Sequence, residues 1–356
     1  MKVCNVNLVK SSLVFVLVEG RRLAALKFFK PNLITHFLHM AHLLLALSLL
    51  LQAFTFVELN CENLFDTQHD EGKNDTEYTP SGTYHWSKTR YWRKLDRTGQ
   101  TLLSCVDLKD AAVPDMAVLC EVENDTVMRD LTRRSLLRNA RYEYVVTQSA
   151  DERGIDVALL YSPMSFRLLS SHAIRITPIK GMRPTRDILY AKGLIISGDT
   201  LHIVGVHFPS RRGGEKLSHP FRQHAAQRLT ETIDSIYSIN AQARIIVAGD
   251  FNMYADDGIM KSILSHGLVS LSAQAKGARG AKGTYRYHGA WGSLDHILIS
   301  PSMMPCATNC YINDAAFLTE PDERYGGFKP KRNYQGPVFR NGFSDHLPLV
   351  GRFVFQ

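Results

Sequence analysis

The sequence predicts an α/β protein in which two β-sheets pack against each other and helices cover their outer faces. Hydrophobic runs of strand length outnumber the helical patterns, and two long helices are expected among them. Several of the runs end in a short polar signature, which places Asn, Glu, Asp and His side chains at strand ends. Such groups converge readily on one site, so the patterns that predict the fold also predict where its chemistry lies.

Residues 1–54 are expected to form an N-terminal extension. Residues 1–39 are basic and carry no clear motif, and an apolar run follows over residues 43–54, just after Met40. This run is shorter than the about 20 residues of a membrane span, but it has the length of the core of a secretory signal. We therefore expect a signal that starts near Met40 and a protein exported to the periplasm or the cell exterior. The alternative is a membrane anchor through residues 43–56.

The remaining chain, residues 55–356, is expected to be one domain, because its polar signatures extend from Asn60 to His346 and would have to meet. Apolar spacing predicts an amphipathic helix over about 87–108 and a second long helix over 221–239. Strands are predicted over 55–59, 116–120, 142–147, 157–161, 191–196, 201–206, 244–248 and 294–299. Two segments rich in glycine and charge are predicted to be mobile loops, 274–283 and 322–342.

Charge and cysteine content restrict the function only in part. The formal net charge is +8, but residues 1–39 carry +5 of it, so the charge of the remaining chain says little about the substrate. The six cysteines include no CxxC pair, which argues against a structural zinc site. Cys61 and Cys120 are predicted to be small core residues, and Cys306 with Cys310 could form a short-loop disulfide.

Five polar signatures occur in a fixed order along the chain. They are VELNCENLFD at 57–66, AVLCE at 117–121, IVAGDFN at 246–252, LDHIL at 294–298 and FSDHLP at 343–348. Carboxylate, amide and imidazole groups of this kind suit a hard divalent cation bound to phosphate. Each motif alone could be a turn or a buried Asp–His pair, but all five together favour a phosphate-processing site.

In this order and context, the signatures resemble the endonuclease/exonuclease/phosphatase superfamily over nearly all of residues 55–356. The details around Asn60, His207 and Ser344 are similar to a bacterial, often exported branch of that superfamily. The resemblance implies a four-layer α/β/β/α sandwich of two packed, mainly antiparallel sheets flanked by helices. It also implies that the site lies at one edge of the two sheets.

The resemblance further implies the roles of the site residues. Glu121 would be the principal ligand of Mg²⁺ or Mn²⁺, with Asn60 and Asp345 as further ligands. The implied catalytic residues also have separate roles. Asp250 would orient or deprotonate the attacking water, and Asn252 would hold that water or a phosphate oxygen. His207 would donate a hydrogen bond, and His346, paired with Asp295, would contact phosphate or act as the base.

Three arginines are candidate substrate-binding residues. Arg211 and Arg212 follow His207 in a loop bounded by glycine, where their guanidinium groups could bind phosphate. Arg153 is expected to reach the substrate from a strand edge. The alternative for all three is ordinary surface charge.

These observations predict a metal-dependent phosphodiesterase, in particular an exported endonuclease-type nuclease that cuts DNA or RNA by in-line attack of water. The alternatives are a phosphomonoesterase or lipid-headgroup phosphodiesterase on the same scaffold, and a binding module without catalysis. The longer motifs of inositol polyphosphate 5-phosphatases are absent from the sequence, which disfavours inositide phosphates. No protein partner is implied, and a monomer is expected.

Overall fold

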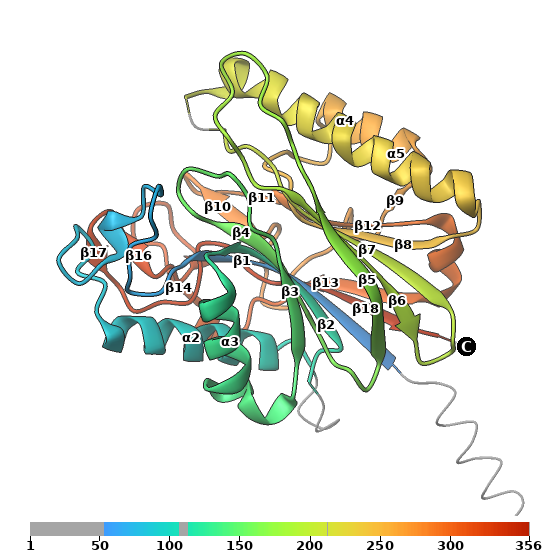
Figure 1. The fold of residues 1–356 in the computed structure, drawn as a ribbon. Helices are drawn as coiled ribbons and strands as arrows, with labels where there is room; N and C mark the ends of the chain where they lie inside the picture. The colour runs from blue at the N-terminus through green and yellow to red at the C-terminus, as the bar shows by residue number, and fades with distance from the viewer. Residues whose placement is uncertain (1–52, 107–112, 212, 356) are drawn as a thin grey trace, which may run out of the picture. The chain divides into compact units, whose positions relative to one another are not determined.

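Two six-stranded sheets form the centre of the fold in the computed structural model, which describes residues 53–106, 113–211 and 213–355 (Figure 1). The first sheet has the order β13 (Ala307–Ile312), β18 (Leu349–Val354), β1 (Ala53–Leu64), β2 (Met116–Val122), β4 (Asp156–Tyr161), β3 (Glu143–Val146). The second has the order β5 (Phe166–Ile174), β6 (Ile188–Ile195), β7 (Thr200–His207), β8 (Arg244–Asp250), β12 (Asp295–Ile299), β9 (Val269–Ser270). Within these sheets the β1–β2 and β7–β8 pairs are parallel and the others antiparallel. The sheets are therefore mainly antiparallel, as predicted.

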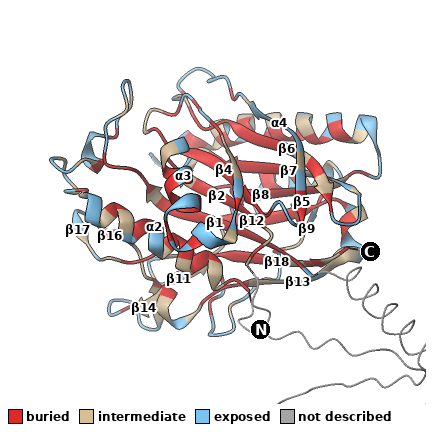
Figure 2. Cartoon of the chain, turned by 60° about the horizontal axis from the view of Figure 1, so that its bottom comes forward, coloured by how far each residue is buried: buried red, intermediate tan, exposed pale blue. Residues whose placement is uncertain are grey.

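Helices cover the outer face of each sheet, which gives the predicted four layers. α2 (Lys88–Leu103) and α3 (Asp125–Arg133) pack on the first sheet through one buried apolar cluster. α4 (Glu215–Ile239) and α5 (Gly258–Ser265) pack on the second through another. A third cluster fills the space between the sheets. Most strands are buried on both faces, whereas exposed residues gather on helices and loops (Figure 2).

Short elements complete the described chain. Three hairpins are formed by β10 (Tyr285–Tyr287) with β11 (Ala290–Gly292), β14 (Thr319–Pro321) with β15 (Phe328–Pro330), and β16 (Tyr334–Gln335) with β17 (Val338–Phe339). The 3₁₀ helices are η1 (Thr76–Tyr78), η3 (Leu136–Ala140), η4 (Pro301–Cys306) and η5 (Ala316–Leu318). The hairpins lie partly within 322–342, so that segment is more ordered than a loop prediction implies.

Side-chain capping defines where the helices of the first layer begin. The hydroxyl of Ser87 accepts a hydrogen bond from the backbone N–H of Arg90, and the Asn124 side chain accepts one from Val127 at 3.0 Å. Both caps satisfy backbone donors that a helix start leaves unpaired. The predicted helix over 87–108 therefore begins where expected, although α2 ends earlier, at Leu103.

The cysteine prediction is confirmed for Cys61 and Cys120, which are buried. Cys306 and Cys310 are free thiols, so the alternative of a disulfide between them is not realised. Within the described ranges, no helix has both the length and the apolar character needed to cross a membrane. The predicted signal within residues 1–54 lies almost entirely outside the described residues, and so does Arg212.

Candidate active site

The polar signatures meet at one edge of the two sheets because of the strand directions. β1 and β2 run parallel, as do β7 and β8, so the last residues of each pair lie at the same end. β12 is antiparallel to β8, and β18 is antiparallel to β1. The start of β12 and the residues just before β18 are therefore brought to that same edge.

A cavity of about 610 Å³ opens at this edge. Its wall combines nearly all of the predicted site residues with three tyrosines: Asn60, Glu121, Arg153, His207, Arg211, Asp250, Asn252, Tyr254, Tyr285, Tyr287, Asp345 and His346. Asp295 is fully buried and reaches the site through its contact with His346. The structure thus brings together residues that lie as far apart in sequence as Asn60 and His346.

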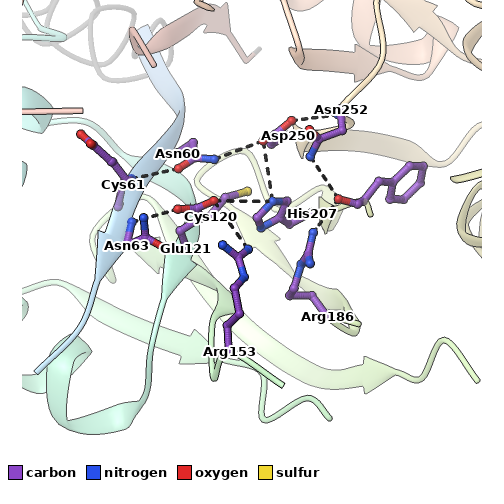
Figure 3. Close-up of polar contacts among 12 residues, drawn as sticks. Asn60, Cys61, Asn63, Cys120, Glu121, Arg153, Arg186, His207, Asp250 and Asn252 are labelled. Carbon is purple, nitrogen blue, oxygen red and sulfur yellow. Dashed lines mark hydrogen bonds and ion pairs between the residues drawn. The ribbon is translucent and has the colours of Figure 1, made fainter. Parts of the chain in front are cut away.

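Glu121 and Asn60 project from neighbouring strand ends (Figure 3). One carboxylate oxygen of Glu121 accepts a hydrogen bond from the backbone N–H of Asn63 at 2.9 Å. The other lies 4.0 Å from Nε2 of His207 and 3.9 Å from a guanidinium nitrogen of Arg153. Glu121 has φ 61°, a left-handed conformation that is uncommon for residues other than glycine. Such backbone strain is concentrated at functional sites, and here it accompanies a carboxylate on the cavity wall.

Asp345 adds a second carboxylate to this wall. Its Oδ2 accepts a hydrogen bond from Arg332 at 2.9 Å, and its side chain is 21% exposed. The amide oxygen of Asn60 accepts a hydrogen bond from the Glu62 N–H at 2.9 Å and keeps a second lone pair. Two carboxylates and an amide on one wall form an all-oxygen donor set, which fits a hard cation such as Mg²⁺ or Mn²⁺.

Asp250 is held in place from two sides (Figure 3). One of its carboxylate oxygens accepts a hydrogen bond from the Asn60 amide at 3.1 Å, and the other accepts one from the backbone N–H of Asn252 at 2.8 Å. Asn252 is fixed in turn, since its amide donates to the carbonyl of Phe208 at 3.1 Å. Burial and the nearby Asp295 raise the pKa of Asp250 to about 7. A carboxyl group with such a pKa is suited to accept a proton near neutral pH.

His346 forms a buried pair with Asp295, as predicted. Its Nδ1 lies 2.7 Å from Oδ2 of Asp295, and the hydroxyl of Thr284 donates to the same carboxylate oxygen. Burial lowers the pKa of His346, but Asp295, Asp345 and Asp250 outweigh that effect and raise the pKa well above its usual value. The raised pKa favours the imidazolium form at neutral pH, and His346 lies on the cavity wall. Ligand atoms of Asp250, Asp295 and His346 lie within 4.8 Å of one another.

His207 has the opposite ionisation. Burial first, and then Arg186 and Arg153, lower its pKa well below the usual value, so the ring is neutral. Its Nε2 lies 3.7 Å from a carboxylate oxygen of Asp250, and its Nδ1 is a buried atom without a hydrogen-bond partner among the described residues. A neutral imidazole can donate one hydrogen bond, so His207 and His346 offer one neutral and one cationic donor.

The described arginine candidates, Arg153 and Arg211, both lie on the cavity wall. Arg153 has a side chain that is 40% exposed. Arg211 contacts the ring of Tyr254, with 4.9 Å between its guanidinium carbon and the ring centre, and its Nε lies 2.6 Å from Glu215. Both can therefore reach a bound anion without leaving the wall.

Sequence reasoning missed two buried charged residues beneath the site. Glu58 is fully buried, and its pKa is raised well above the usual value by burial, Asp295 and Asp250. Its position two residues before Asn60 on one strand was the available signal, because alternate residues face the same side of a sheet. Lys94 of α2 is also buried and donates a hydrogen bond to the carbonyl of Phe343, and no local sequence pattern predicts that contact.

Comparison with known proteins identifies a family that the chain matches. A family model described as "Endonuclease/Exonuclease/phosphatase family" matches residues 55–353. A search of curated proteins found no match.

Solved structures share the fold at low sequence identity. A mannosyl-6-phosphatase from Bacteroides thetaiotaomicron is 16% identical, with a TM-score of 0.56 over 85% of this chain and 100% of that one. The human Nocturnin catalytic domain with a bound sulfate anion is 20% identical, with a TM-score of 0.50 over 85% of this chain and 95% of that one. D. rerio TDP2 complexed with single-strand DNA product is 16% identical, with a TM-score of 0.50 over 85% and 99%. At these identities the likeness establishes the fold alone.

Proposed function

The chain belongs to the endonuclease/exonuclease/phosphatase family, and we propose that it is a divalent-metal-dependent phosphodiester hydrolase that acts as an endonuclease-type nuclease. Family membership supports hydrolysis of a phosphoester bond. The choice of a phosphodiester in nucleic acid rests on the wall of the cavity. Both DNA and RNA carry the phosphodiester group that this proposal requires.

The observation that carries the proposal is the combination of phosphate-binding and aromatic groups around one cavity. Arg153 and Arg211 supply positive charge next to the polar centre. Tyr254, Tyr285 and Tyr287 lie on the same wall, and the side chains of Tyr254 and Tyr287 are exposed. Tyrosine rings stack on bases while arginines neutralise the backbone, which is how single-stranded nucleic acid is commonly held.

The residues of the cavity would accept a proton from the attacking water and bind the phosphate, and the leaving alkoxide would take its proton from bulk water. Asp250 would accept the proton of the attacking water, since the Asn60 amide and the Asn252 N–H fix both of its oxygens. The cationic His346 and the neutral His207 would donate hydrogen bonds to phosphate oxygens as negative charge develops there. Glu121, Asn60 and Asp345 would hold Mg²⁺ or Mn²⁺, which neutralises the phosphate and stabilises charge on the leaving oxygen.

The test compares activity of the purified chain on four substrates with Mg²⁺, Mn²⁺ or EDTA present. The substrates are plasmid DNA, RNA, an aryl phosphodiester and an aryl phosphomonoester. Asp250→Asn should lower activity by about two to four orders of magnitude, whereas Asp256→Asn, which changes an exposed carboxylate nearby, should not.

Metal-dependent nicking of nucleic acid that is strongly reduced in Asp250→Asn is the expected result. Cleavage of the phosphomonoester alone would contradict the nuclease proposal and assign the chain to the phosphatases. If the folded protein cleaves none of the four substrates, the proposal that it hydrolyses phosphodiesters in nucleic acid is also contradicted.

A further inference from the structure

A second group of acidic side chains lies outside the cavity, in the loop that joins β1 to η1 and at the end of β2. Carboxylate oxygens of Asp70, Asp75 and Glu123 lie within 4.8 Å of one another. Asp66 adjoins them, because its backbone N–H donates to Glu123 at 2.6 Å. None of these four residues lines the cavity described above. The group is therefore separate from the proposed catalytic centre.

Glu123 provides an observation that points to a missing ligand. Its side chain is buried, with 4% of the residue exposed, and one carboxylate oxygen, Oε1, has no hydrogen-bond partner among the described residues. The other oxygen accepts the hydrogen bond from Asp66. A buried carboxylate oxygen without a partner is costly, and native proteins rarely leave one unsatisfied. The carboxylates of Asp70 and Asp75 beside it make a cation the natural partner.

The protein itself supplies little positive charge to this group. Among the described residues, these four carboxylates form a single ion pair, between His69 and Asp75. Lys73 lies in the same loop but donates instead to the carbonyls of Ser149 and Asp151, at 3.0 and 2.8 Å. Several carboxylates are thus held together without a lysine or arginine among them.

The loop arranges these carboxylates with hydrogen bonds from its own backbone. Asp75 accepts from the N–H of Asp70 at 2.8 Å, and Asp66 accepts from the N–H of Gln68 at 2.6 Å. The Asn124 amide lies 3.5 Å from oxygens of both Asp66 and Asp70. Each of these bonds uses one lone pair, so the carboxylates retain capacity to bind a cation.

We propose that Asp70, Asp75 and Glu123 bind a calcium ion, with Asp66 beside them. Calcium takes six to eight oxygen ligands in flexible geometry, whereas magnesium demands a near-ideal octahedron and retains its waters. The donor set consists of carboxylates alone, and Asp70 is only half-buried, so water can complete the shell. His69 is placed to orient the Asp75 carboxylate, as partners of metal ligands commonly do.

The ion would fix the loop of residues 66–75 to the end of β2. This loop begins three residues after Asn63, whose N–H donates to Glu121 at 2.9 Å, and Glu123 follows Glu121 by two residues. Calcium binding should therefore stabilise the fold next to the cavity without taking part in the reaction. The proposal does not depend on the substrate of the enzyme.

The experiment measures calcium binding by calorimetry and the melting temperature with CaCl₂ or EDTA. The variants are Glu123→Gln, which keeps the shape of a buried residue, Asp70→Asn at a half-buried position, Glu121→Gln in the cavity, and Glu71→Gln as an exposed control beside Asp70. We expect wild type, Glu121→Gln and Glu71→Gln to bind calcium and melt several degrees higher with it. Glu123→Gln and Asp70→Asn should lose at least about tenfold in affinity.

Two results of the calcium titrations would overturn the proposal. One is wild-type protein whose melting temperature and calorimetric trace do not respond to millimolar CaCl₂. The other is calcium binding that persists in Glu123→Gln and Asp70→Asn but disappears in Glu121→Gln, which would place the ion in the cavity. Asp70→Asn keeps the test valid if Glu123→Gln fails to fold. Titrations with MnCl₂ and ZnCl₂ check the ion, and tight zinc binding without calcium binding would refute the assignment to calcium.

Discussion

The Nδ1 atom of His346 lies 2.7 Å from a carboxylate oxygen of Asp295, although 51 residues separate them in sequence. The pair joins β12 of one sheet to the segment before β18 of the other, so it depends on how the two sheets pack. The Thr284 hydroxyl donates to the same carboxylate oxygen. This arrangement orients the ring and leaves the Nε2–H group available to donate to a substrate.

Asp295→Asn should therefore lower both the pKa of His346 and the turnover rate. The substitution removes the negative charge of Asp295, which stabilises the imidazolium of His346. Loss of this charge should reduce kcat by about 10- to 100-fold or more. NMR titration of the His346 ring and kcat measured on the same sample would check both effects. The exposed pair of Asp234 and His266, 2.9 Å apart, offers a matched control, because Asp234→Asn should leave kcat unchanged. An unaltered His346 titration in Asp295→Asn would contradict this reading.

The pH dependence of activity should follow the ionisation of the Asp250 carboxyl group. Its pKa is raised to about 7, so acidification protonates the proposed base and kcat/KM should fall about tenfold per pH unit on the acid side. A bound cation lowers the pKa of a nearby carboxyl, so the midpoint with Mg²⁺ should lie at or below about pH 7. Profiles from about pH 5 to pH 9 would test this. Asp250→Asn should lose about two to four orders of magnitude in kcat. A flat wild-type profile would exclude Asp250 as the base.

Lys94 should contribute to both stability and activity. Its ammonium group is buried, donates to the Phe343 carbonyl, and lies among the charges of Glu62 and Asp345. Lys94→Met removes a partner from the Phe343 carbonyl and from Glu62, so the free energy of unfolding should fall by about 3 kcal/mol. The segment that carries Asp345 and His346 also loses an anchor, so kcat should fall. Urea denaturation and kinetics would measure both, with Lys88→Met on the exposed side of α2 as control. Wild-type stability in Lys94→Met would refute this role.

The strand ends and their polar residues could be predicted because local patterns encode them. Asn60, Glu121 and Asp250 each terminate a hydrophobic run, and apolar spacing marks both long helices, although α4 begins at Glu215, before the predicted start at Phe221. In contrast, β5 was missed because it is an edge strand whose residues are mostly exposed, and polar residues interrupt its apolar ones. β1 extends further than predicted because its later polar residues are buried by tertiary contacts.

Other site residues could not be predicted because distant partners define them. Lys94 and Phe343 lie 249 positions apart, and the Arg332 contact with Glu62 joins residues 270 positions apart. In the sequence, the acidic loop at residues 66–75 resembles an ordinary polar turn. Only the fold places Glu123 beside it. Sequence patterns therefore predict the residues that project from regular strands, whereas buried charge pairs emerge only from packing.

Arg211 should affect substrate binding more than chemistry. Its side chain is 38% exposed on the cavity wall and lies over Tyr254. Arg211→Ala should raise KM for nucleic acid and reduce the slope of log KM against log salt by about 1, because one phosphate contact is lost. kcat should change little. Arg129→Ala, which removes an exposed arginine from α3, is the matched control. An unchanged salt slope in Arg211→Ala would argue that this arginine is surface charge.

Gly249 should be intolerant of any side chain, because the pairing of β7 with β8 leaves no room for one. Its φ is 146°, and a Cβ atom there would lie 1.8 Å from the carbonyl oxygen of Val206. Gly249→Ala should therefore lower the free energy of unfolding by about 3 kcal/mol or more. Activity should fall as well, because the neighbouring pair in register is His207 with Asp250. Gly258→Ala, where a Cβ meets nothing within 4 Å, is the control and should be neutral or slightly stabilising. Equal urea midpoints for the two variants would show that the strands can separate here at little cost.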